Sequence, residues 1–435
     1  MAAKGLDALG ASLLDHRTKG MPGGVAPFRL DAIGAKGWNL LREDLPLPVA
    51  VLKQSALAHN GAWMRDFLKR SGAVIAPHGK TTMSPQLFQR QLDDGAWAIT
   101  VATPQQLQVC RDVGFSRIVL ANQLVGRQAT RFVLDELKRD PSFDFYCLVD
   151  SVRGVELMAA AARAAPAGRP IQVLLEGGYP GGRTGARDLD TALAVARAVK
   201  AAAPLLSLRG VEGFEGLFGG ASDTAIESQV RGFLDFLVEI ARAAEREDLF
   251  GDGPVLLTAG GSAFYDLVVA RFRGAGLTRP VQVVTRSGCY LTHDSGIYQR
   301  AFGALGKRSP DAAGNGPGPR AALEVWAYVQ SRPEPTKALL TLGKRDASYD
   351  DMPVALVWYR PGSNARLPSA MPAGHVVTGL NDQHCHMTVP ASSPLDVGDL
   401  VGFGISHPCL TFDKWQVIPL VDDDYGVVGA IRTFF

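Results

Sequence analysis

The chain has 435 residues, of which 46% are apolar and 20% are charged, and this balance favours a large folded core over global disorder. Its 45 basic and 43 acidic residues give a formal net charge of +2, without the long basic runs that bind nucleic acid. No apolar run approaches the roughly 18 residues of a membrane span, and the N-terminal stretch lacks the apolar centre of a signal peptide. We therefore expect neither a nucleic-acid partner nor membrane association.

The cysteine content indicates the cellular compartment, and the chain length indicates the number of domains. Five cysteines are scattered along the chain, which does not suit a disulfide framework and favours a reducing cytoplasm. The length suits a barrel of roughly 250 residues plus a second module. Two domains are therefore expected.

Strand-like and helical patterns alternate over the first two thirds of the chain. Residues 5–14 are typical of a short amphipathic helix or a frayed tail. From about residue 73 onward, eight short apolar runs are each followed by apolar side chains at helical spacing. The eight runs occupy residues 73–76, 97–102, 117–121, 143–149, 171–176, 208–214, 254–259 and 281–285.

This alternation predicts a parallel sheet in an α/β fold. Eight strand and helix units match a closed (β/α)8 TIM barrel, which we assign to residues 46–300. An open doubly wound sheet is the alternative. The barrel is favoured because candidate polar groups follow several different strands, and the active site of such a barrel lies at the C-terminal ends of its strands.

The pattern changes after residue 300. Residues 307–320 are rich in Gly, Pro and Ser, which predicts a mobile surface loop near a domain boundary. Beyond it, short β-prone runs are separated by turn residues without intervening helices. The sequence predicts a mostly β domain over residues 301–435, joined by part of residues 1–45.

The first predicted barrel strand ends in the segment Ala76–Thr82, which places Lys80 at the mouth of the barrel. Partial desolvation or a nearby cation makes a lysine amine nucleophilic at neutral pH. A solvated surface lysine is the alternative interpretation of this position. After the fifth strand, Tyr179 and Arg183 lie in a glycine-rich segment where the backbone can approach a ligand and Arg183 brings a permanent charge.

Two further strand ends have the character of a phosphate site. Gly260, Gly261 and Ser262 follow the seventh strand and offer backbone N–H groups and a hydroxyl at a helix N-terminus. Gly288 and Tyr290 follow the eighth strand and add a backbone N–H group and a phenol. An ordinary helix cap and a plain loop are the alternatives.

The C-terminal domain contains two groups of possible metal ligands. His407 and Cys409 form an H-x-C pair, which in extended conformation would place both side chains on one face of a strand. Histidine and thiolate suit zinc, and two protein ligands leave positions open for water and substrate. His384 and His386 are the alternative pair, and Cys409 could instead be a small core residue.

Taken together, these residues resemble the D-serine dehydratase and D-threonine aldolase family, whose barrel is of the alanine racemase type. Pro77–Thr81 resembles the family's Pro-His-x-Lys-Thr motif, in which the lysine forms the Schiff base with pyridoxal phosphate. Arg183–Gly185 resembles the Arg-x-Gly element and Gly260–Ser262 the phosphate-binding turn. His407 and Cys409 fall where the family binds a divalent metal.

The resemblance implies roles for individual residues. It implies a metal site at His407 and Cys409, with zinc favoured over manganese or magnesium, and a catalytic His384 beside that metal. It implies pyridoxal phosphate contacts from Lys80, His78, Arg183, Tyr179, Gly260, Gly261, Ser262, Gly288 and Tyr290.

The resemblance also implies the reaction. Because cysteine as the second ligand goes with zinc-dependent dehydratases, we expect a D-serine or D-threonine dehydratase that yields a 2-oxo acid and ammonia. A D-threonine aldolase is the main alternative, followed by an amino-acid racemase and a non-catalytic pyridoxal phosphate carrier. A small D-amino acid as substrate and a cytoplasmic homodimer are expected from the resemblance.

Overall fold

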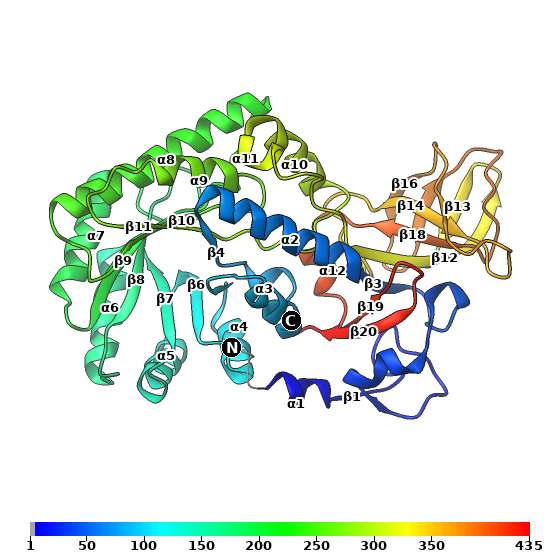
Figure 1. Cartoon of the computed structure of the whole chain (residues 1–435), viewed down its shortest axis with the longest axis horizontal. Helices are drawn as coiled ribbons and strands as arrows, with labels where there is room; N and C mark the ends of the chain where they lie inside the picture. The colour runs from blue at the N-terminus through cyan, green and yellow to red at the C-terminus, as the bar shows by residue number, and fades with distance from the viewer. Residues whose placement is uncertain (1–4) are drawn as a thin grey trace.

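The computed structural model of the chain describes residues 5–435 and contains two large sheets (Figure 1). The first is an eight-stranded parallel sheet in the order β4, β11, β10, β9, β8, β7, β6, β5. Its strands are β4 (Val74–Ile75), β5 (Ile99–Val101), β6 (Arg117–Gln123), β7 (Asp144–Val149), β8 (Ile171–Glu176), β9 (Leu206–Glu212), β10 (Val255–Ala259) and β11 (Val281–Thr285). All eight predicted strands are confirmed.

The sheet closes into a barrel between its two end strands. The backbone N–H of Trp97 donates to the carbonyl of Ile75 over 2.8 Å, and that of Thr100 donates to the carbonyl of Pro77 over 2.9 Å. A separate cluster of buried strand side chains fills the barrel, as expected for this architecture. Its members are Ala76, Ala98, Val119, Tyr146, Leu148, Leu174, Leu256 and Val284.

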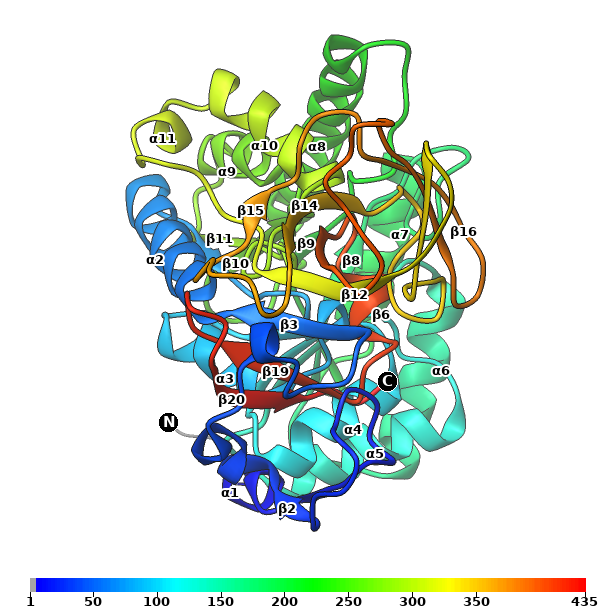
Figure 2. The same cartoon turned by 90° about the vertical axis from the view of Figure 1, so that its right-hand side faces the viewer.

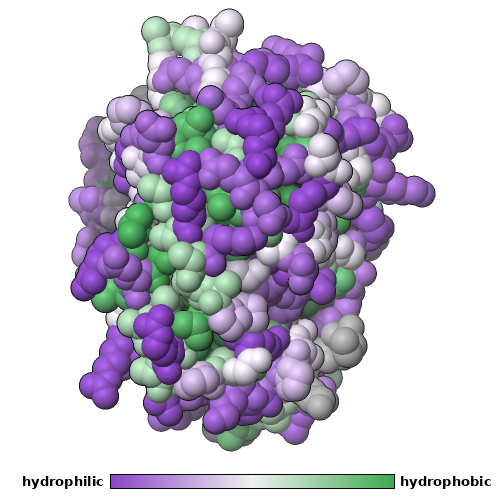
Figure 3. Space-filling model, turned by 90° about the vertical axis from the view of Figure 1, so that its left-hand side faces the viewer, coloured by the Kyte–Doolittle hydropathy of each residue, from purple (hydrophilic) through white to green (hydrophobic). Residues whose placement is uncertain are grey.

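Helices connect successive strands and cover the outside of the barrel. They are α2 (Gln54–Ser71), α3 (Pro85–Asp93), α4 (Pro104–Val113), α5 (Arg127–Arg139), α6 (Val152–Ala164), α7 (Leu189–Ala201), α8 (Asp223–Arg246) and α9 (Tyr265–Arg273). The side chains of Thr103, Ser151 and Asp188 cap α4, α6 and α7 by accepting a backbone N–H. The outer face of the barrel is largely hydrophilic with scattered apolar side chains (Figure 3). Within residues 5–435, no helix has the length and apolar character to cross a lipid bilayer.

The second sheet is mostly antiparallel and confirms the predicted β character of the C-terminal region. Its strands from that region are β12 (Leu323–Glu334), β13 (Lys337–Leu340), β14 (Val354–Tyr359), β15 (Ser369–Ala370), β16 (Val376–Leu380), β17 (Cys385–Thr388), β18 (Leu400–Gly404), β19 (Val417–Val421) and β20 (Val427–Arg432). A short helix, α12 (Cys409–Phe412), follows β18.

Segments from before the barrel join this second sheet (Figure 2). The strand β3 (Val49–Lys53) pairs with β12 in antiparallel and with β19 in parallel orientation. The residues before it form α1 (Leu6–Gly10), β1 (Leu13–Leu14), β2 (Phe28–Arg29), η1 (Leu30–Lys36) and η2 (Leu40–Arg42). The boundaries at residues 46 and 300 stay a prediction, and β3 shows that one segment from the barrel range belongs to the other sheet.

The prediction of a mobile loop over residues 307–320 is wrong for the first part of that segment. Helices α10 (Ile297–Arg308) and α11 (Pro310–Ala313) extend into it. The Arg308 guanidinium holds the buried Asp266 carboxylate at 2.8 and 2.9 Å, and the Ser309 hydroxyl caps α11. The contact between Arg308 and Asp266 joins residues distant in sequence, so the local composition does not reveal it.

Candidate active site

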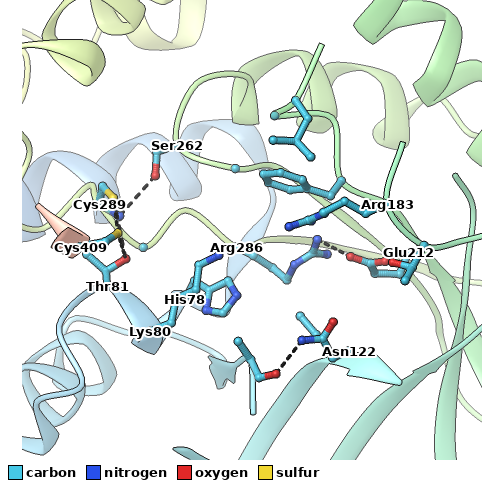
Figure 4. Close-up of a pocket in the computed structure, with 18 of the residues that line it drawn as sticks. His78, Lys80, Thr81, Asn122, Arg183, Glu212, Ser262, Arg286, Cys289 and Cys409 are labelled. Carbon is cyan, nitrogen blue, oxygen red and sulfur yellow. Dashed lines mark hydrogen bonds and ion pairs between the residues drawn. The ribbon is translucent and has the colours of Figure 1, made fainter. Parts of the chain in front are cut away.

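A pocket of about 420 Å³ opens at the C-terminal ends of the barrel strands (Figure 4). Segments that follow β4, β8, β9, β10 and β11 line it, and two residues after β18 of the second sheet complete the wall. Of the predicted site residues, those that line the pocket are His78, Lys80, Arg183, Gly261, Ser262, Gly288, His407 and Cys409. The predicted Tyr179, Gly260, Tyr290 and His384 are not among its lining residues.

Lys80 lies in the turn η3 (Gly79–Thr81), directly after β4, and its side chain is open to the pocket. Desolvation lowers the pKa of its amine, and the positive charges of Arg183 and Arg286 lower it further. A lowered pKa increases the neutral, nucleophilic fraction of the amine near pH 7. The position therefore suits a lysine that reacts with a carbonyl group.

His78 lies beside Lys80 and is half-buried. Burial lowers the pKa of its imidazole well below the ordinary value, so the ring is neutral. In the described part of the chain, its buried Nδ1 atom has no hydrogen-bond partner. Because buried polar atoms normally have partners, this orphaned nitrogen indicates a place for a ligand.

Arg286 and Glu212 are buried together at the barrel end and were not predicted from the sequence. The Arg286 guanidinium pairs with the Glu212 carboxylate and donates to the Thr258 hydroxyl at 2.8 Å and the Gly213 carbonyl at 3.0 Å. Burial raises the pKa of Glu212 to about 8, although Arg286 opposes that shift. The two residues directly follow or end strands β11 and β9, which was the signal available in the sequence.

The expected phosphate cradle is partly occupied by a carboxylate. Glu215 is fully buried and accepts the backbone N–H groups of Gly260 at 3.0 Å and Gly261 at 2.8 Å. The two N–H groups that we expected to be free are therefore engaged in this structure. The Ser262 hydroxyl faces the pocket and accepts from the Ser287 hydroxyl at 3.1 Å.

The two predicted tyrosines lie outside the pocket, contrary to expectation. The Tyr179 ring stacks on Phe218 with their centroids 4.2 Å apart. Tyr290 is buried beside Gln91, and burial raises the pKa of its phenol. Its neighbour Cys289 lines the pocket instead.

Arg183 extends into the pocket with its guanidinium 4.6 Å from the centre of the Phe214 ring. The side chain is exposed, and within residues 5–435 it forms no ion pair. An aromatic face supports the arginine and leaves its N–H donors available. The position suits recognition of a carboxylate or another anionic oxygen.

His407 and Cys409 do line one pocket, but the extended conformation expected for them is wrong. β18 ends at Gly404, His407 has a φ of 56°, and Cys409 begins α12. Pro408 has φ −55° and ψ −32°, so this proline starts the helix in place of a continued strand.

The imidazole of His407 is held by a carboxylate that the sequence did not reveal. Its Nδ1 lies 2.6 Å from an oxygen of Asp350, and its backbone N–H donates to Asp294 over 2.9 Å. A carboxylate on one ring nitrogen orients the other for a metal. In residues 5–435, however, no three His, Cys, Asp or Glu side chains form a group able to hold a metal ion. His407 and Cys409 are therefore the two candidate metal ligands in the wall of the pocket.

Cys409 lies beside a second thiol, Cys289. Their Sγ atoms are 3.9 Å apart, and the Thr81 hydroxyl oxygen lies 3.6 Å from Cys409 and 3.7 Å from Cys289. Hydrogen bonding from Cys289 lowers the pKa of Cys409 to about 7, assisted by Thr81 and by the charge of Lys80. A thiolate at neutral pH is the form that binds metal.

The predicted role of His384 beside the metal is not supported by its position. His384 is exposed between β16 and β17, where its carbonyl accepts the Asn381 N–H at 2.9 Å. His386 pairs through Nε2 with the Asn381 side chain at 2.6 Å. The hairpin that carries both histidines lies at the end of the second sheet remote from the barrel (Figure 1).

Comparisons with known proteins identify what the sequence is similar to. A family model described as a putative serine dehydratase domain matches residues 322–421. A D-threonine aldolase from Arthrobacter sp. is 25% identical over 399 residues, which cover 91% of this chain and 93% of the aldolase. The predicted family resemblance is confirmed. Aldolases and dehydratases are lyases, in agreement with the predicted enzyme class.

Solved structures confirm the predicted fold. A D-threonine aldolase from Filomicrobium marinum has a TM-score of 0.72 at 22% identity and covers 94% of this chain and 98% of its own. The D-threo-3-hydroxyaspartate dehydratase of a Delftia species has a TM-score of 0.69 at 22% identity, covering 91% and 99%. A variant of that dehydratase with a cysteine replaced by alanine was solved in a metal-free form. Alanine racemase from Bacillus anthracis has a TM-score of 0.58 at 14% identity, covering 88% and 97%.

Proposed function

We propose that the chain is a pyridoxal phosphate- and metal-dependent lyase that dehydrates D-3-hydroxy amino acids to a 2-oxo acid and ammonia. One observation carries the proposal. Lys80 at the end of β4 and the pair His407 and Cys409 after β18 are far apart in sequence yet line the same pocket. The site thus combines an amine suited to a cofactor aldehyde with ligands suited to a metal ion.

The residues of the pocket fit pyridoxal phosphate. Lys80 would hold the aldehyde carbon, and the orphaned Nδ1 of His78 would gain a partner. Ser262 and Gly288 would contact the phosphate, with Arg183 reaching a phenolic or carboxylate oxygen. When bound, the cofactor supplies an electron sink for negative charge at the substrate Cα.

The chain's own side chains would handle the proton and the carboxylate. Lys80, with its lowered pKa, would take the Cα proton on Nζ and hold it. The free guanidinium of Arg183 would bind the substrate carboxylate and fix which face of the Cα atom is presented to Lys80. The stable pair of Arg286 with Glu212 would keep the barrel end in place beneath them.

His407 and Cys409 would hold a divalent ion, and the sulfur ligand favours zinc over manganese or magnesium. Such an ion supplies Lewis acidity toward a hydroxyl oxygen. The metal-free form of the cysteine-to-alanine variant of the similar dehydratase is compatible with a cysteine ligand here. Asp350 would orient the His407 ring from behind.

A D-threonine aldolase is the second candidate. The Arthrobacter aldolase, with 25% identity, and the Filomicrobium aldolase, with the TM-score of 0.72, favour it. In that reaction the bond between Cα and Cβ breaks, and glycine and an aldehyde form. The cysteine at position 409 is the observation that favours the dehydratase.

We also propose a cytoplasmic homodimer with domains over residues 46–300 and 301–435. All five cysteines are free thiols, which supports a reducing compartment. The homodimer rests on the family resemblance, and the domain boundaries rest on the change of sequence pattern near residue 300.

Product analysis tests the proposed reaction. The purified protein would be loaded with pyridoxal phosphate and zinc and incubated with D-serine and D-threonine. A 2-oxo acid and ammonia without glycine supports the dehydratase, whereas glycine with an aldehyde supports the aldolase. The L-enantiomer as the main product, or no turnover of either substrate with cofactor bound, contradicts the proposal.

A further inference from the structure

The two thiols at the edge of the pocket form a pair with no parallel elsewhere in residues 5–435. Cys289 follows β11 of the barrel, and Cys409 begins α12, which follows β18 of the second sheet, with 3.9 Å between their Sγ atoms (Figure 4). The other three cysteines, Cys110, Cys147 and Cys385, are buried in separate elements, and the described residues show no sulfur contact among them. A dithiol at this distance lines a pocket open to small molecules.

We infer that Cys289 and Cys409 are a site of reversible oxidation, at which a peroxide converts the two thiols to a disulfide. This inference goes beyond the proposed lyase activity. Cys409 is the partly exposed member, whereas Cys289 is 4% exposed, so the peroxide reaches Cys409 first. The geometry also explains why oxidation stops at a disulfide, because the second sulfur is already in contact.

The chemistry balances with hydrogen peroxide as the named oxidant. The Cys409 sulfur attacks one peroxide oxygen, the O–O bond breaks, and a sulfenic acid and one water form. The Cys289 sulfur then attacks the Cys409 sulfur, and a second water leaves as the S–S bond forms. The two thiols lose two electrons and two protons in total, and the peroxide is reduced to two waters.

Bond formation requires a small local movement. The Sγ atoms, 3.9 Å apart, must approach to about 2.05 Å. The disulfide would join the barrel segment after β11 to the start of α12, across one wall of the pocket. It would also remove the Cys409 sulfur from any bond to a metal ion.

Thiol counting and peptide mapping test the inference. Metal-free protein carrying pyridoxal phosphate would be treated briefly with hydrogen peroxide, quenched with catalase, denatured and assayed for thiols. We expect the count to fall from five to three and a linked peptide pair that contains Cys289 and Cys409. Dithiothreitol should restore all five thiols.

Two variants serve as matched controls. In Cys289→Ser the linked peptide pair should vanish, and Cys409 should proceed to the sulfinic acid because no resolving thiol remains. In Cys385→Ser, which removes a buried cysteine of β17, the linked pair should form as in the unaltered protein. Absence of the linked pair in the unaltered protein, or a link between any other two cysteines, would overturn the inference.

Comparing zinc-loaded with metal-free protein tests this inference independently of the proposed metal site. If zinc binds Cys409, zinc-loaded protein should form the disulfide several times more slowly than metal-free protein. Equal rates with and without zinc would contradict the metal role of Cys409 and leave the oxidation site standing. A linked pair that fails to form in metal-free protein would overturn the oxidation site and leave the metal role standing.

Discussion

The pocket has two sides that differ in how far their polar groups are paired (Figure 4). On the paired side, Glu212 and Glu215 are buried, one against the Arg286 guanidinium and the other against the N–H groups of Gly260 and Gly261. The open side consists of Lys80, His407, Cys409 and Cys289, which line the pocket.

This difference indicates which residues contribute to the stability of the fold and which contribute to binding and catalysis. Buried polar side chains that already have partners in the fold stabilise one arrangement of the barrel end and leave less capacity to bind a ligand. Side chains with free lone pairs or donors retain the capacity to bind ligands. Substitutions on the paired side should therefore alter the free energy of unfolding, and those on the open side should alter binding and turnover in a folded protein.

The largest expected effect is on the open side, at Lys80. Lys80→Ala should lower turnover by about 10³-fold or more, because it removes both the covalent attachment and the base. It should also abolish the visible absorbance of bound cofactor and its reduction by borohydride. Lys69→Ala, at an exposed position in the last turn of α2, should change neither property. Unchanged cofactor reduction in Lys80→Ala would contradict the assignment.

On the paired side, Glu212 should make stability depend on pH. Its pKa rises from the usual 4.5 to about 8 in the folded protein, because burial penalises its charged form. The folded state thus keeps a proton that the unfolded chain releases, so this contribution is complete below about pH 4.5 and is lost as the pH rises through about 8.

Glu212→Gln should remove this pH dependence, which amounts to several kcal/mol at most. Urea unfolding at acidic and mildly alkaline pH measures it. In the exposed control Glu239→Gln, the loss of stability with rising pH should remain as in the unaltered protein. An identical slope in Glu212→Gln would show that the carboxyl is already ionised in the folded state.

The third expected effect is at Asp350, which supports the open side from behind. Asp350→Asn should weaken zinc binding about 10-fold to 100-fold, because the His407 ring loses its charged partner. Competition with a chromogenic chelator measures the affinity. Asp351→Asn is the control, since the neighbouring Asp351 pairs with the exposed Arg300 instead. Equal zinc affinities of the two variants would argue against His407 as a ligand.

The smallest expected effect is at Glu215 on the paired side. Glu215→Gln should lower the free energy of unfolding by about 1 to 3 kcal/mol, because a neutral amide replaces a carboxylate that accepts two backbone N–H groups. Denaturant titration of the cofactor-free protein checks this. A gain in stability would mean that the desolvation of the carboxylate destabilises the fold more than its two hydrogen bonds stabilise it.

The barrel and Lys80 could be predicted because their signals are local. Each strand and its following helix are encoded by apolar spacing within a short segment, and Lys80 lies in a compact motif at a strand end. Glu215 and Asp350 were missed because their roles depend on segments distant in sequence. No spacing rule places Glu215 against the turn after β10.

The errors have the same physical origin. For His384, the family resemblance suggested a role beside the metal, whereas the side chain is exposed in the hairpin of β16 and β17. For His407 and Cys409, the H-x-C spacing suggested a strand, whereas Pro408 has helical dihedral angles and α12 begins at Cys409. Composition predicted a loop over residues 307–320, but Arg308 anchors part of it as helix through Asp266.

The pairing of β3 has a consequence for how the chain acquires its structure. Val49 to Leu52 are completely buried between β12 and β19, two strands that lie more than 250 residues further along the chain. During synthesis this apolar strand emerges before the whole barrel and stays without its neighbours until the end of the second sheet leaves the ribosome. Such distant pairing makes folding of the second sheet slow. It also leaves an unpaired, aggregation-prone strand edge exposed for as long as translation of the barrel lasts.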